Sequence, residues 1–426
     1  MLTLPRLVIA GLLLSLAGAA WAQAAPSAQF RARAAALVGL FNGTAKPETI
    51  FSPNFLRHVP TAQLDAISTQ LKEQLGQART LGKIEAASPI SGTVFIEFER
   101  GTLNLRMDVG ATSPHLVEGL LITGTEVKGD TLTAIIEELK KLPGQTSLSV
   151  ARLGDGSPTP IAAHETARVL AIGSTFKLFL LAELSRSIQA GERKWTDVAR
   201  LDRRSLPSGF LQSWPEGAPM TLYGLAGLMI SQSDNTATDT LLHALGRERV
   251  EQLLPSLGVG AAARNRPFLS TLEAFALKAG TGEAAAGWAG ADEAKRRMLL
   301  ESYAKLTPAQ VALEKLGGDP KQIDTIEWFA SAEDLIRTMD WLRRNSGKEA
   351  LDILAINPGI GSALAGELGY LGYKGGSETG VMNMTFLVRS KRGQWHAVSG
   401  GWNDPKAAID EGKFVALMSR AVSLLR

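Results

Sequence analysis

Gly173-Ser174-Thr175-Phe176-Lys177 runs directly into the apolar segment Leu178-Phe179-Leu180-Leu181-Ala182. A serine and a lysine three positions apart lie on one face of a helix, so the amine can hydrogen-bond the hydroxyl and take its proton. A helix that begins here also offers backbone N–H groups to an oxyanion. Because the residues after Lys177 are apolar on nearly every side, we expect a buried helix, which favours a neutral lysine.

A Ser-x-x-Lys spacing is weak on its own, because a chain of 426 residues contains about one by chance. Two further motifs follow it, Ser233-Asp234-Asn235 and Lys374-Gly375-Gly376-Ser377. The Ser233 hydroxyl can relay a proton from the base to a departing amide nitrogen. The Asn235 amide can hold Lys177 on one side and a substrate amide on the other. With Ser174 and Lys177, Ser233 completes the predicted catalytic set, and Asn235 is a predicted substrate-binding residue.

The third motif lies on a predicted edge strand. Lys374 would place a positive charge where a substrate carboxylate can sit. Gly376 would let the strand approach the substrate closely. The backbone N–H groups of Ser174 and Ser377 would then form an oxyanion hole. We therefore predict that Lys374, Gly376 and Ser377 bind substrate.

Each motif also has a purely structural interpretation. Ser233-Asp234-Asn235 followed by Thr236 fits a helix N-cap, and Lys-Gly-Gly fits a turn. Ser52-Pro53-Asn54 also matches Ser-x-Asn, although it precedes any plausible nucleophile. Three motifs in this order, each on the expected kind of element, are much rarer than any one of them. The combination favours the catalytic interpretation, as a hypothesis to be tested against the structure.

Composition and the first residues of the chain indicate an exported globular protein. The sequence is 45% hydrophobic and 20% charged, has no cysteine and carries a net charge of +3. It therefore has no disulfide framework, and no nucleic-acid partner is expected. Residues 1–22 are typical of a cleavable signal peptide, with Arg6, a short apolar run and a small-x-small site that ends at Ala22. An uncleaved anchor helix is the alternative. We expect a periplasmic or secreted protein.

Residues 23–127 are predicted to form a small α+β domain. Apolar residues recur at helical spacing in 28–41 and 61–74. Strand patterns follow at 93–98, 103–109 and 116–122. Two helices followed by a meander suggest a compact layer of helices on a sheet. No cluster of catalytic residue types is evident in this domain.

Residues 128–426 are predicted to form a second α+β domain. A helix over 130–142, capped by Asp130, precedes a strand at 146–153. A long helical region follows the Ser174 motif and includes a solvated insertion at 279–320. Further strands are predicted at 161–163, 371–375, 381–389 and 394–401. A last helix is predicted over 404–425. Strands from both ends of the domain should therefore join in one antiparallel sheet with helices packed on it.

The three motifs together resemble those of the class A β-lactamase and penicillin-binding serine hydrolase superfamily. The runs 267–271 and 372–378 look like a two-domain branch of it, similar to the serine hydrolase of the clavulanic acid gene cluster. This resemblance implies a β-lactamase/D,D-peptidase-like domain preceded by a cystatin-like or steroid-isomerase-like domain. It also implies acylation of Ser174 by a β-lactam or a related amide or ester, without a cofactor.

The chain departs from this pattern at two positions. The family's usual threonine after the strand lysine is Gly375 here, which removes one hydroxyl from the carboxylate pocket. The glutamate that activates the deacylating water has one candidate, Glu273, but no asparagine follows at the family's spacing. Ser270-Thr271-Leu272-Glu273 also reads as a capping box, which we favour because its pattern is complete. Fast deacylation is therefore in question, although acylation is not.

Other kinds of site find little support in the sequence. The five histidines, His58, His115, His164, His243 and His396, include no pair at metal-ligand spacing, so we expect no metal. No Gly-x-Ser-x-Gly elbow occurs, which argues against an α/β-hydrolase triad. The expected partner is a small-molecule β-lactam, ester or peptidoglycan-like substrate. A slow D,D-peptidase or esterase, and a binding protein without turnover, remain the alternatives.

Overall fold

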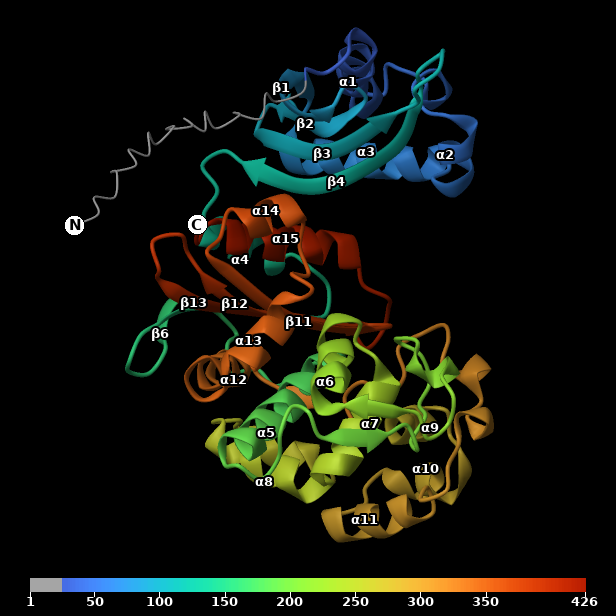
Figure 1. The fold of residues 1–426 in the computed structure, drawn as a ribbon, viewed down its shortest axis with the longest axis vertical. Coiled ribbons are helices and arrows are strands. Elements are labelled where there is room, and N and C mark those ends of the chain that lie inside the picture. Colours follow the sequence, from blue (N-terminus) through green and yellow to red (C-terminus); the bar gives the residue numbers. More distant parts are fainter. Residues whose placement is uncertain (1–24) are drawn as a thin grey trace, which may run out of the picture. The chain divides into compact units, whose positions relative to one another are not determined.

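The computed structural model describes residues 25–426, so the predicted signal peptide at 1–22 lies outside the described residues. The chain divides into two compact units between Leu121 and Ile122 (Figure 1). The first unit contains α1 (Ala28–Phe41), η1 (Pro47–Thr49), α2 (Pro53–His58), α3 (Thr61–Leu75) and strands β1 (Ala78–Ser88), β2 (Ser91–Phe98), β3 (Gly101–Val109) and β4 (Val117–Val127), the last of which crosses the division.

The first unit is a layer of helices on a four-stranded sheet, in strand order β1-β2-β3-β4. Ser27 caps α1 by accepting the Phe30 N–H, and one face of α1 is buried. Alternate residues of β2 are buried, among them Val94, Ile96 and Phe98, because successive side chains of a strand point to opposite faces. The two predicted helices and the meander are therefore present.

Strand β1 was not predicted from the sequence. It pairs antiparallel with β2 at the edge of the sheet, and its register shifts at three places. Each shift breaks the two-residue alternation of buried and exposed side chains, which is the signal by which a strand is found in a sequence. An edge strand with bulges therefore leaves little trace in the hydrophobic pattern.

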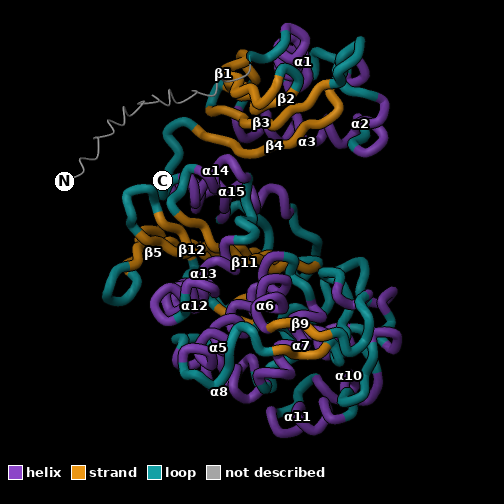
Figure 2. The backbone as a smooth tube through the Cα atoms, in the orientation of Figure 1, coloured by secondary structure: helices purple, strands orange, loops and turns teal. Residues whose placement is uncertain are grey.

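The second unit is organised around a five-stranded antiparallel sheet, in strand order β11-β12-β13-β5-β6 (Figure 2). Its strands are β5 (Gln145–Leu153), β6 (Thr159–His164), β11 (Tyr370–Glu378), β12 (Val381–Arg389) and β13 (Trp395–Asn403). The pairing of β13 with β5 joins the end of the chain to the beginning of this unit. The prediction of one sheet built from both ends of the domain is confirmed.

Helices cover both faces of this sheet. The helices are α4 (Leu132–Leu139), α5 (Lys177–Gln189), α6 (Leu222–Ser231), α7 (Asn235–Leu245), α8 (Arg247–Ser256), α9 (Thr271–Lys278), α10 (Gly282–Trp288), α11 (Glu293–Glu301), α12 (Ala332–Asn345), α13 (Lys348–Ala355), α14 (Ser362–Gly366) and α15 (Glu411–Ser423). One hydrophobic core joins α4 and α15 to one face of the sheet. A second, larger core joins α5 to α12 and to the helices that follow α5.

Short elements connect these helices and strands. They are β7 (Leu170–Ala171), β8 (Val198–Arg200), β9 (Pro219–Thr221), β10 (Phe329–Ala330), and the 3-10 turns η2 (Gly173–Phe176), η3 (Leu211–Ser213), η4 (Ala262–Asn265), η5 (Pro308–Gln310) and η6 (Leu313–Lys315). Strand β10 pairs antiparallel with β7, just before the turn that carries Ser174. The segment after Glu327 is therefore fixed beside the Ser174 turn.

Two helix boundaries differ from the sequence-based prediction. Thr131, rather than Asp130, caps α4, because Thr131 accepts the Ala134 N–H while the Asp130 carboxylate binds Arg420 on α15. The last helix begins at Glu411, capped by Asp410, and residues 404–410 form a loop. At α4 the partner of the carboxylate is distant in the sequence and cannot be read from periodicity, whereas at α15 the cap is a local one, in which Asp410 accepts the Lys413 N–H.

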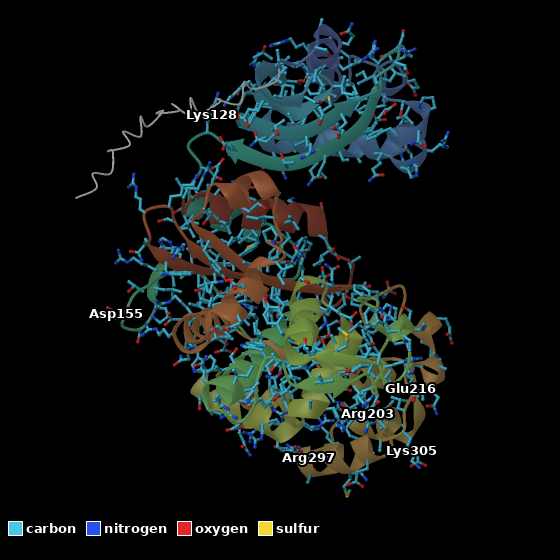
Figure 3. The ribbon with its side chains drawn as sticks, in the orientation of Figure 1. Lys128, Asp155, Arg203, Glu216, Arg297 and Lys305 are labelled. Carbon is cyan, nitrogen blue, oxygen red and sulfur yellow. The ribbon has the colours of Figure 1, made fainter. Side chains whose placement is uncertain are left out.

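The predicted insertion at 279–320 contains helices α10 and α11 and two 3-10 turns. It is less solvated than predicted, because Trp288 and Leu300 are buried in the larger core. Arg297 of α11, labelled in Figure 3, forms an ion pair with Glu251 of α8 at 2.5 Å. The insertion is thus attached to the helical side of the unit.

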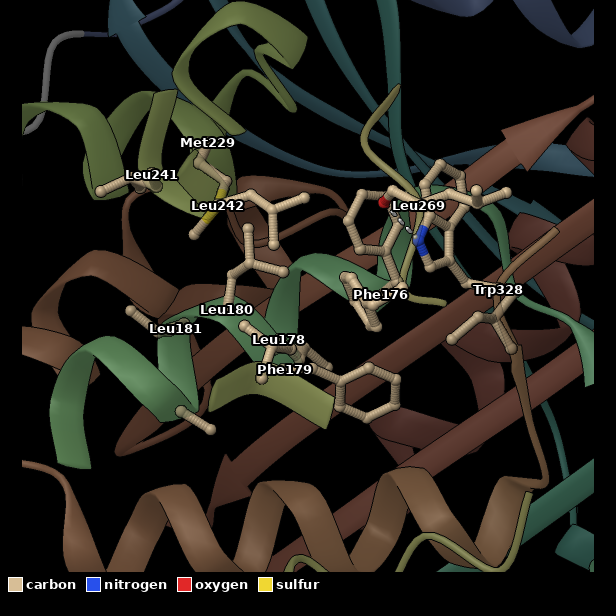
Figure 4. Packing of buried hydrophobic residues seen from close by; sticks show 14 of the residues in the cluster. Phe176, Leu178, Phe179, Leu180, Leu181, Met229, Leu241, Leu242, Leu269 and Trp328 are labelled. Carbon is tan, nitrogen blue, oxygen red and sulfur yellow. Dashed lines mark hydrogen bonds between the residues drawn. The ribbon is translucent and has the colours of Figure 1, made fainter. Parts of the chain in front are cut away.

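The helix after Ser174 is buried, as predicted. Ten of its residues, beginning with Lys177, have little or no solvent exposure. The Phe176 ring stacks on Trp328 with centroids 3.7 Å apart, and the Trp328 indole N–H donates to Leu269 O at 3.1 Å (Figure 4). The α-helix begins one turn later than predicted, because residues 173–176 form the 3-10 turn η2.

Candidate active site

The turn η2 presents Ser174 at the start of a buried helix. Ser174 is partly exposed, whereas Lys177 is completely buried. Gly173 has φ of +47°, a conformation that favours glycine because residues with a β-carbon rarely adopt it. Lys177 directly follows this turn as its C-cap, and residues three apart in a 3-10 turn lie on one face.

Lys177 makes its hydrogen bonds with the Ser233 loop. Its Nζ lies 2.6 Å from Ser233 O, 2.7 Å from Asn235 Oδ1 and 3.1 Å from Ser233 Oγ. In the described part of the chain, no hydrogen bond joins Lys177 to Ser174. The expected pairing of Lys177 with Asn235 is present, while the expected bond to the Ser174 hydroxyl is replaced by one to Ser233.

The Ser233-Asp234-Asn235 motif is both a helix cap and part of this cluster. The Asp234 carboxylate accepts the Ala237 N–H at 2.8 Å and so caps α7. It also accepts the N–H groups of Phe210 and Leu211, which fixes the preceding loop. The structural interpretation of the motif is therefore correct for Asp234, while its two neighbours turn toward Lys177.

Ser233 lies between α6 and α7 and has φ of +54°. This left-handed conformation is uncommon for a residue with a side chain, and such strain gathers at functional sites. Lys374 approaches Ser233 from β11, the edge strand of the sheet. Its Nζ lies 3.1 Å from Ser233 Oγ and also contacts Gly375 O. One hydroxyl is thus shared by two lysine amines that are 197 residues apart in the sequence.

Gly376 brings β11 directly against the Ser174 turn. A β-carbon at position 376 would lie 2.6 Å from Thr175 N and closer still to Ser174 N. A β-carbon at position 173 would in turn lie 3.1 Å from Ser377 N. The backbone segments that carry the Ser174 and Ser377 N–H groups therefore touch, and only glycine leaves room for this approach. In the structure, Gly376 thus lies in close contact with the Ser174 turn.

The two site lysines have strongly altered proton affinities. Burial, followed by the nearby charge of Lys374, holds the pKa of Lys177 well below its usual range. Burial alone lowers the pKa of Lys374 to about 7. Taking an ammonium group out of water disfavours its charged form. Both shifts favour the neutral amine, which is the state that accepts a proton.

Glu273 occupies a capping box, as favoured from the sequence. Ser270 Oγ accepts the Glu273 N–H, and the Glu273 carboxylate accepts the Ser270 N–H at 2.7 Å. Arg247 also binds both carboxylate oxygens, at 2.7 and 3.0 Å. Among the described residues, Glu273 has no hydrogen bond to Ser174, Lys177 or Ser233. The capping-box prediction is confirmed.

Gly375, where the resemblance leads one to expect threonine, also has a physical explanation. A β-carbon at this position would collide with the hydroxyl of Tyr373, two residues earlier on β11. Tyr373 is itself held by packing against Phe386, with ring centroids 4.9 Å apart. The tyrosine hydroxyl therefore occupies the space that a side chain at 375 would need.

Two buried features near the site escaped the sequence analysis. Asp239 on α7 accepts the N–H groups of Thr271 and Leu272 and so aligns α9 with α7. Lys278, at the end of α9, binds Glu327 and Glu378. Both features join residues far apart in the sequence, and no local pattern marks them.

Neither a metal centre nor a membrane span is found in the part of the chain that the structure describes. Residues 25–426 contain no group of three or more His, Cys, Asp or Glu side chains placed to hold a metal ion. None of the described helices is both long enough and apolar enough to cross a bilayer.

A family model described as the β-lactamase enzyme family matches residues 130–366. The match spans more than half of the chain and includes Ser174, Lys177 and Ser233, whereas Lys374 lies beyond its end. The chain belongs to this family, and it is a serine hydrolase. No curated protein matches the sequence.

The chain is also similar to solved structures. A β-lactamase from Sphaerobacter thermophilus is 22% identical, with a TM-score of 0.48, and the match covers 68% of this chain and 94% of that one. A β-lactamase from Francisella tularensis is 13% identical, with a TM-score of 0.48 and coverage of 69% and 98%. A mutant of PBP-A, in an acyl-enzyme complex with penicillin G, is 16% identical, with a TM-score of 0.47 and coverage of 68% and 94%.

Proposed function

We propose that this protein is an exported serine hydrolase that acylates Ser174 with the carbonyl carbon of a β-lactam or a related amide or ester. One observation carries the proposal: the Ser233 hydroxyl lies 3.1 Å from the amines of both Lys177 and Lys374. A hydroxyl that lies between a buried neutral amine, proposed for Lys177, and a cationic amine, proposed for Lys374, is suited to pass a proton. Membership of the β-lactamase enzyme family supports the same reaction class.

Hydrogen-bond counting supports Lys177 as the base. A neutral amine has two N–H donors and one lone pair. Ser233 O and Asn235 Oδ1 can only accept, so the two closest contacts of Lys177 use both of its N–H groups. The lone pair is then left for a hydroxyl, and the hydroxyl within hydrogen-bond distance in the structure is that of Ser233, at 3.1 Å. In the proposed reaction the Ser174 hydroxyl, one helical turn away, gives its proton to this lone pair as its oxygen attacks the carbonyl carbon.

The remaining groups would complete the step. The carbonyl oxygen becomes an oxyanion between the N–H groups of Ser174 and Ser377, which lie on touching backbone segments. Lys177 returns its proton through Ser233 to the departing nitrogen or oxygen as the bond to the carbonyl carbon breaks. Asn235 and Lys374 would hold the substrate, the latter through a carboxylate. The product is an ester of Ser174, and the leaving group now carries the proton that the Ser174 hydroxyl gave up.

Deacylation is expected to be slow. Both carboxylate oxygens of Glu273 are occupied by Arg247 and the Ser270 N–H, so this residue is poorly placed to activate water. This observation favours a D,D-peptidase-like or esterase-like enzyme with a long-lived acyl-enzyme over a fast β-lactamase. The role of Glu273 in deacylation can be tested by measuring nitrocefin turnover by the wild-type protein and by the variants Glu273→Gln and Glu273→Asp. Rapid turnover that is lost only in the Gln variant would make Glu273 the deacylation base.

Covalent labelling tests the nucleophile. The purified protein should take up a fluorescent penicillin, seen on a denaturing gel and as a mass increase in an intact-mass spectrum. Ser174→Ala should abolish the label, whereas Ser187→Ala, a buried serine on α5 bonded to Leu184 O, should keep it. Labelling that persists in Ser174→Ala would refute the assignment. A ligand that raises the melting temperature without any covalent adduct would indicate a binding protein instead.

Two finer features belong to the same proposal. The signal peptide at 1–22 would be cleaved after Ala22, so the amino terminus of the exported protein would be Gln23 by sequencing. Residues 23–127 would form the cystatin-like domain of the two-domain branch. The order of helices followed by a four-stranded sheet supports it. An amino terminus at Met1 on the exported protein would contradict the cleavage.

A further inference from the structure

A buried cation with two carboxylate partners lies beside the candidate active site. Lys278 ends α9 and has 9% of its surface exposed. Its Nζ lies 2.6 Å from Glu327 Oε1 and also contacts Glu378 Oε1. The sequence separations are 49 and 100 residues. None of these three residues has a part in the proposed reaction, although burying the ion pair of Lys278 and Glu327 is costly.

Each carboxylate is connected to one of the two backbone segments that form the proposed oxyanion hole. Glu378 directly follows Ser377 on β11. Successive side chains of a strand alternate, so Glu378 lies on the same face of β11 as Lys374 and Gly376, the face that meets the Ser174 turn. Lys278 therefore holds the end of the strand that carries the Ser377 N–H.

The second carboxylate, that of Glu327, is connected to the Ser174 turn. Glu327 accepts the N–H of Trp328 at 3.1 Å. Trp328 stacks on Phe176, inside the Ser-x-x-Lys motif, with centroids 3.7 Å apart. Its carbonyl accepts the Ile172 N–H at 3.0 Å. Figure 4 shows Trp328 and Phe176 side by side. Glu327 is thus joined to the turn by a hydrogen bond, a stacked ring pair and a backbone bond.

We propose that Lys278 is a positioning residue for acylation: by binding Glu378 and Glu327 together, it sets the separation of the Ser377 and Ser174 N–H groups. This inference rests on the proposed function, because it concerns the oxyanion hole of that reaction. A hydrogen-bond donor contributes most when it is already held where charge develops. Lys278 acts through the two backbone segments and touches neither the substrate nor the reacting atoms.

The charge of the cluster fits this role. Burial and the neighbouring Glu327 raise the pKa of Glu378 to about 8, while Glu327 and Glu378 together outweigh burial and raise the pKa of Lys278. The Lys278 cation therefore offsets negative charge on its two glutamate partners, which reduces their repulsion of an oxyanion forming nearby.

The molecule supplies a matched control on the other side of the sheet. Arg420 of α15 is also buried and binds two carboxylates, Asp130 at 2.7 Å and Glu138 at 2.8 Å. These groups belong to the α4 and α15 layer. Breaking either cluster should lower the melting temperature, but only the Lys278 cluster borders the Ser174 turn.

Rapid-mixing acylation with a fluorescent penicillin, at several concentrations, separates initial binding from the acylation rate constant. Lys278→Met should lower that rate constant about tenfold to a hundredfold, as misplaced oxyanion donors do, with little change in initial binding. Lys278→Arg should recover most of the rate. Arg420→Met should lose melting temperature but keep the wild-type rate. Glu378→Met repeats the test with Lys278 in place, and should slow acylation in the same way.

The outcomes separate this inference from the proposed function. Acylation of Lys278→Met at the wild-type rate per folded molecule would overturn the inference alone, as would an equal loss of rate in Arg420→Met. If Lys278→Met does not fold, a wild-type rate in Glu378→Met overturns it. A wild-type protein that takes up no label overturns the proposed function, and this inference falls with it.

Discussion

Lys177 and Lys278 are two buried lysines in one domain with opposite surroundings. Lys177 meets only uncharged oxygens within hydrogen-bond distance, from Ser233 and Asn235, and its pKa is lowered. Lys278 meets two carboxylates, and its pKa is raised. Burial is common to both and disfavours the charge in both. The partners therefore decide which lysine can act as a base and which acts as a permanent cation.

The same substitution at both lysines should give the sharpest contrast. Lys177→Arg should lower the acylation rate about a thousandfold or more, because a guanidinium does not deprotonate and cannot accept the serine proton. Lys278→Arg should retain most of the rate, because that site needs a cation. The measurement is the rate of labelling by a fluorescent penicillin. Equal rates for the two variants would show that the proposed difference in charge state is wrong.

Removing each amine should also separate the two sites in stability. Lys278→Met leaves the buried Glu327 and the partly exposed Glu378 without their cation and should cost about 3–5 kcal/mol of unfolding free energy. Lys177→Met leaves only neutral acceptors unpaired and should cost about 1–3 kcal/mol. Urea unfolding followed by circular dichroism compares them. A larger loss at Lys177 would mean that its amine is charged in the folded protein.

Adding a carboxylate beside Lys177 should make it resemble Lys278. Asn235→Asp places the charge at the position of Oδ1, 2.7 Å from Nζ, and should raise the pKa of Lys177. Because a nearby opposite charge moves a pKa by about one to three, the fraction of neutral amine and the acylation rate at pH 7 should fall, by up to about tenfold for each unit of that shift. The rate should recover at higher pH. Asn235→Ala, which adds no charge, should show no such shift in its pH profile.

The smallest expected effect concerns Lys374, whose pKa burial lowers to about 7. Below this pH the amine is charged and can attract a substrate carboxylate. As the pH rises above 7 the free protein loses this charge, so the affinity for an anionic ligand should fall by up to about tenfold per pH unit. Ligand titrations at pH 6 to 9 measure the slope. Lys374→Arg, which stays charged, should flatten it.

Local patterns predicted much of the site, because some of its geometry is set within one or two turns of chain. The Ser174 and Lys177 spacing puts both residues on one face of the turn. The Ser270 to Glu273 box forms from residues three apart, and the structure confirms it. The joining of strands from both ends into one sheet also followed from element order alone.

Features that depend on distant partners were missed. No sequence pattern near Lys278 indicates that Glu327 or Glu378 would bind it. From the sequence alone, all three residues would be predicted to be exposed charged side chains. The start of α4 was misplaced for the same reason, because Asp130 binds Arg420 rather than the helix N-terminus. Even Lys177 was expected to bond Ser174, but the Ser233 loop, which arrives from 56 residues away, takes that contact.

The left-handed backbone of Ser233 lowers the stability of the folded protein, while its hydroxyl serves the proposed reaction. A residue with a β-carbon costs about 1–2 kcal/mol more than glycine in this conformation. A change to glycine would therefore relieve the backbone while removing the hydroxyl that both lysines share. With serine at this position the loop is less stable than it would be with glycine, but the hydroxyl provides the proposed path of the proton.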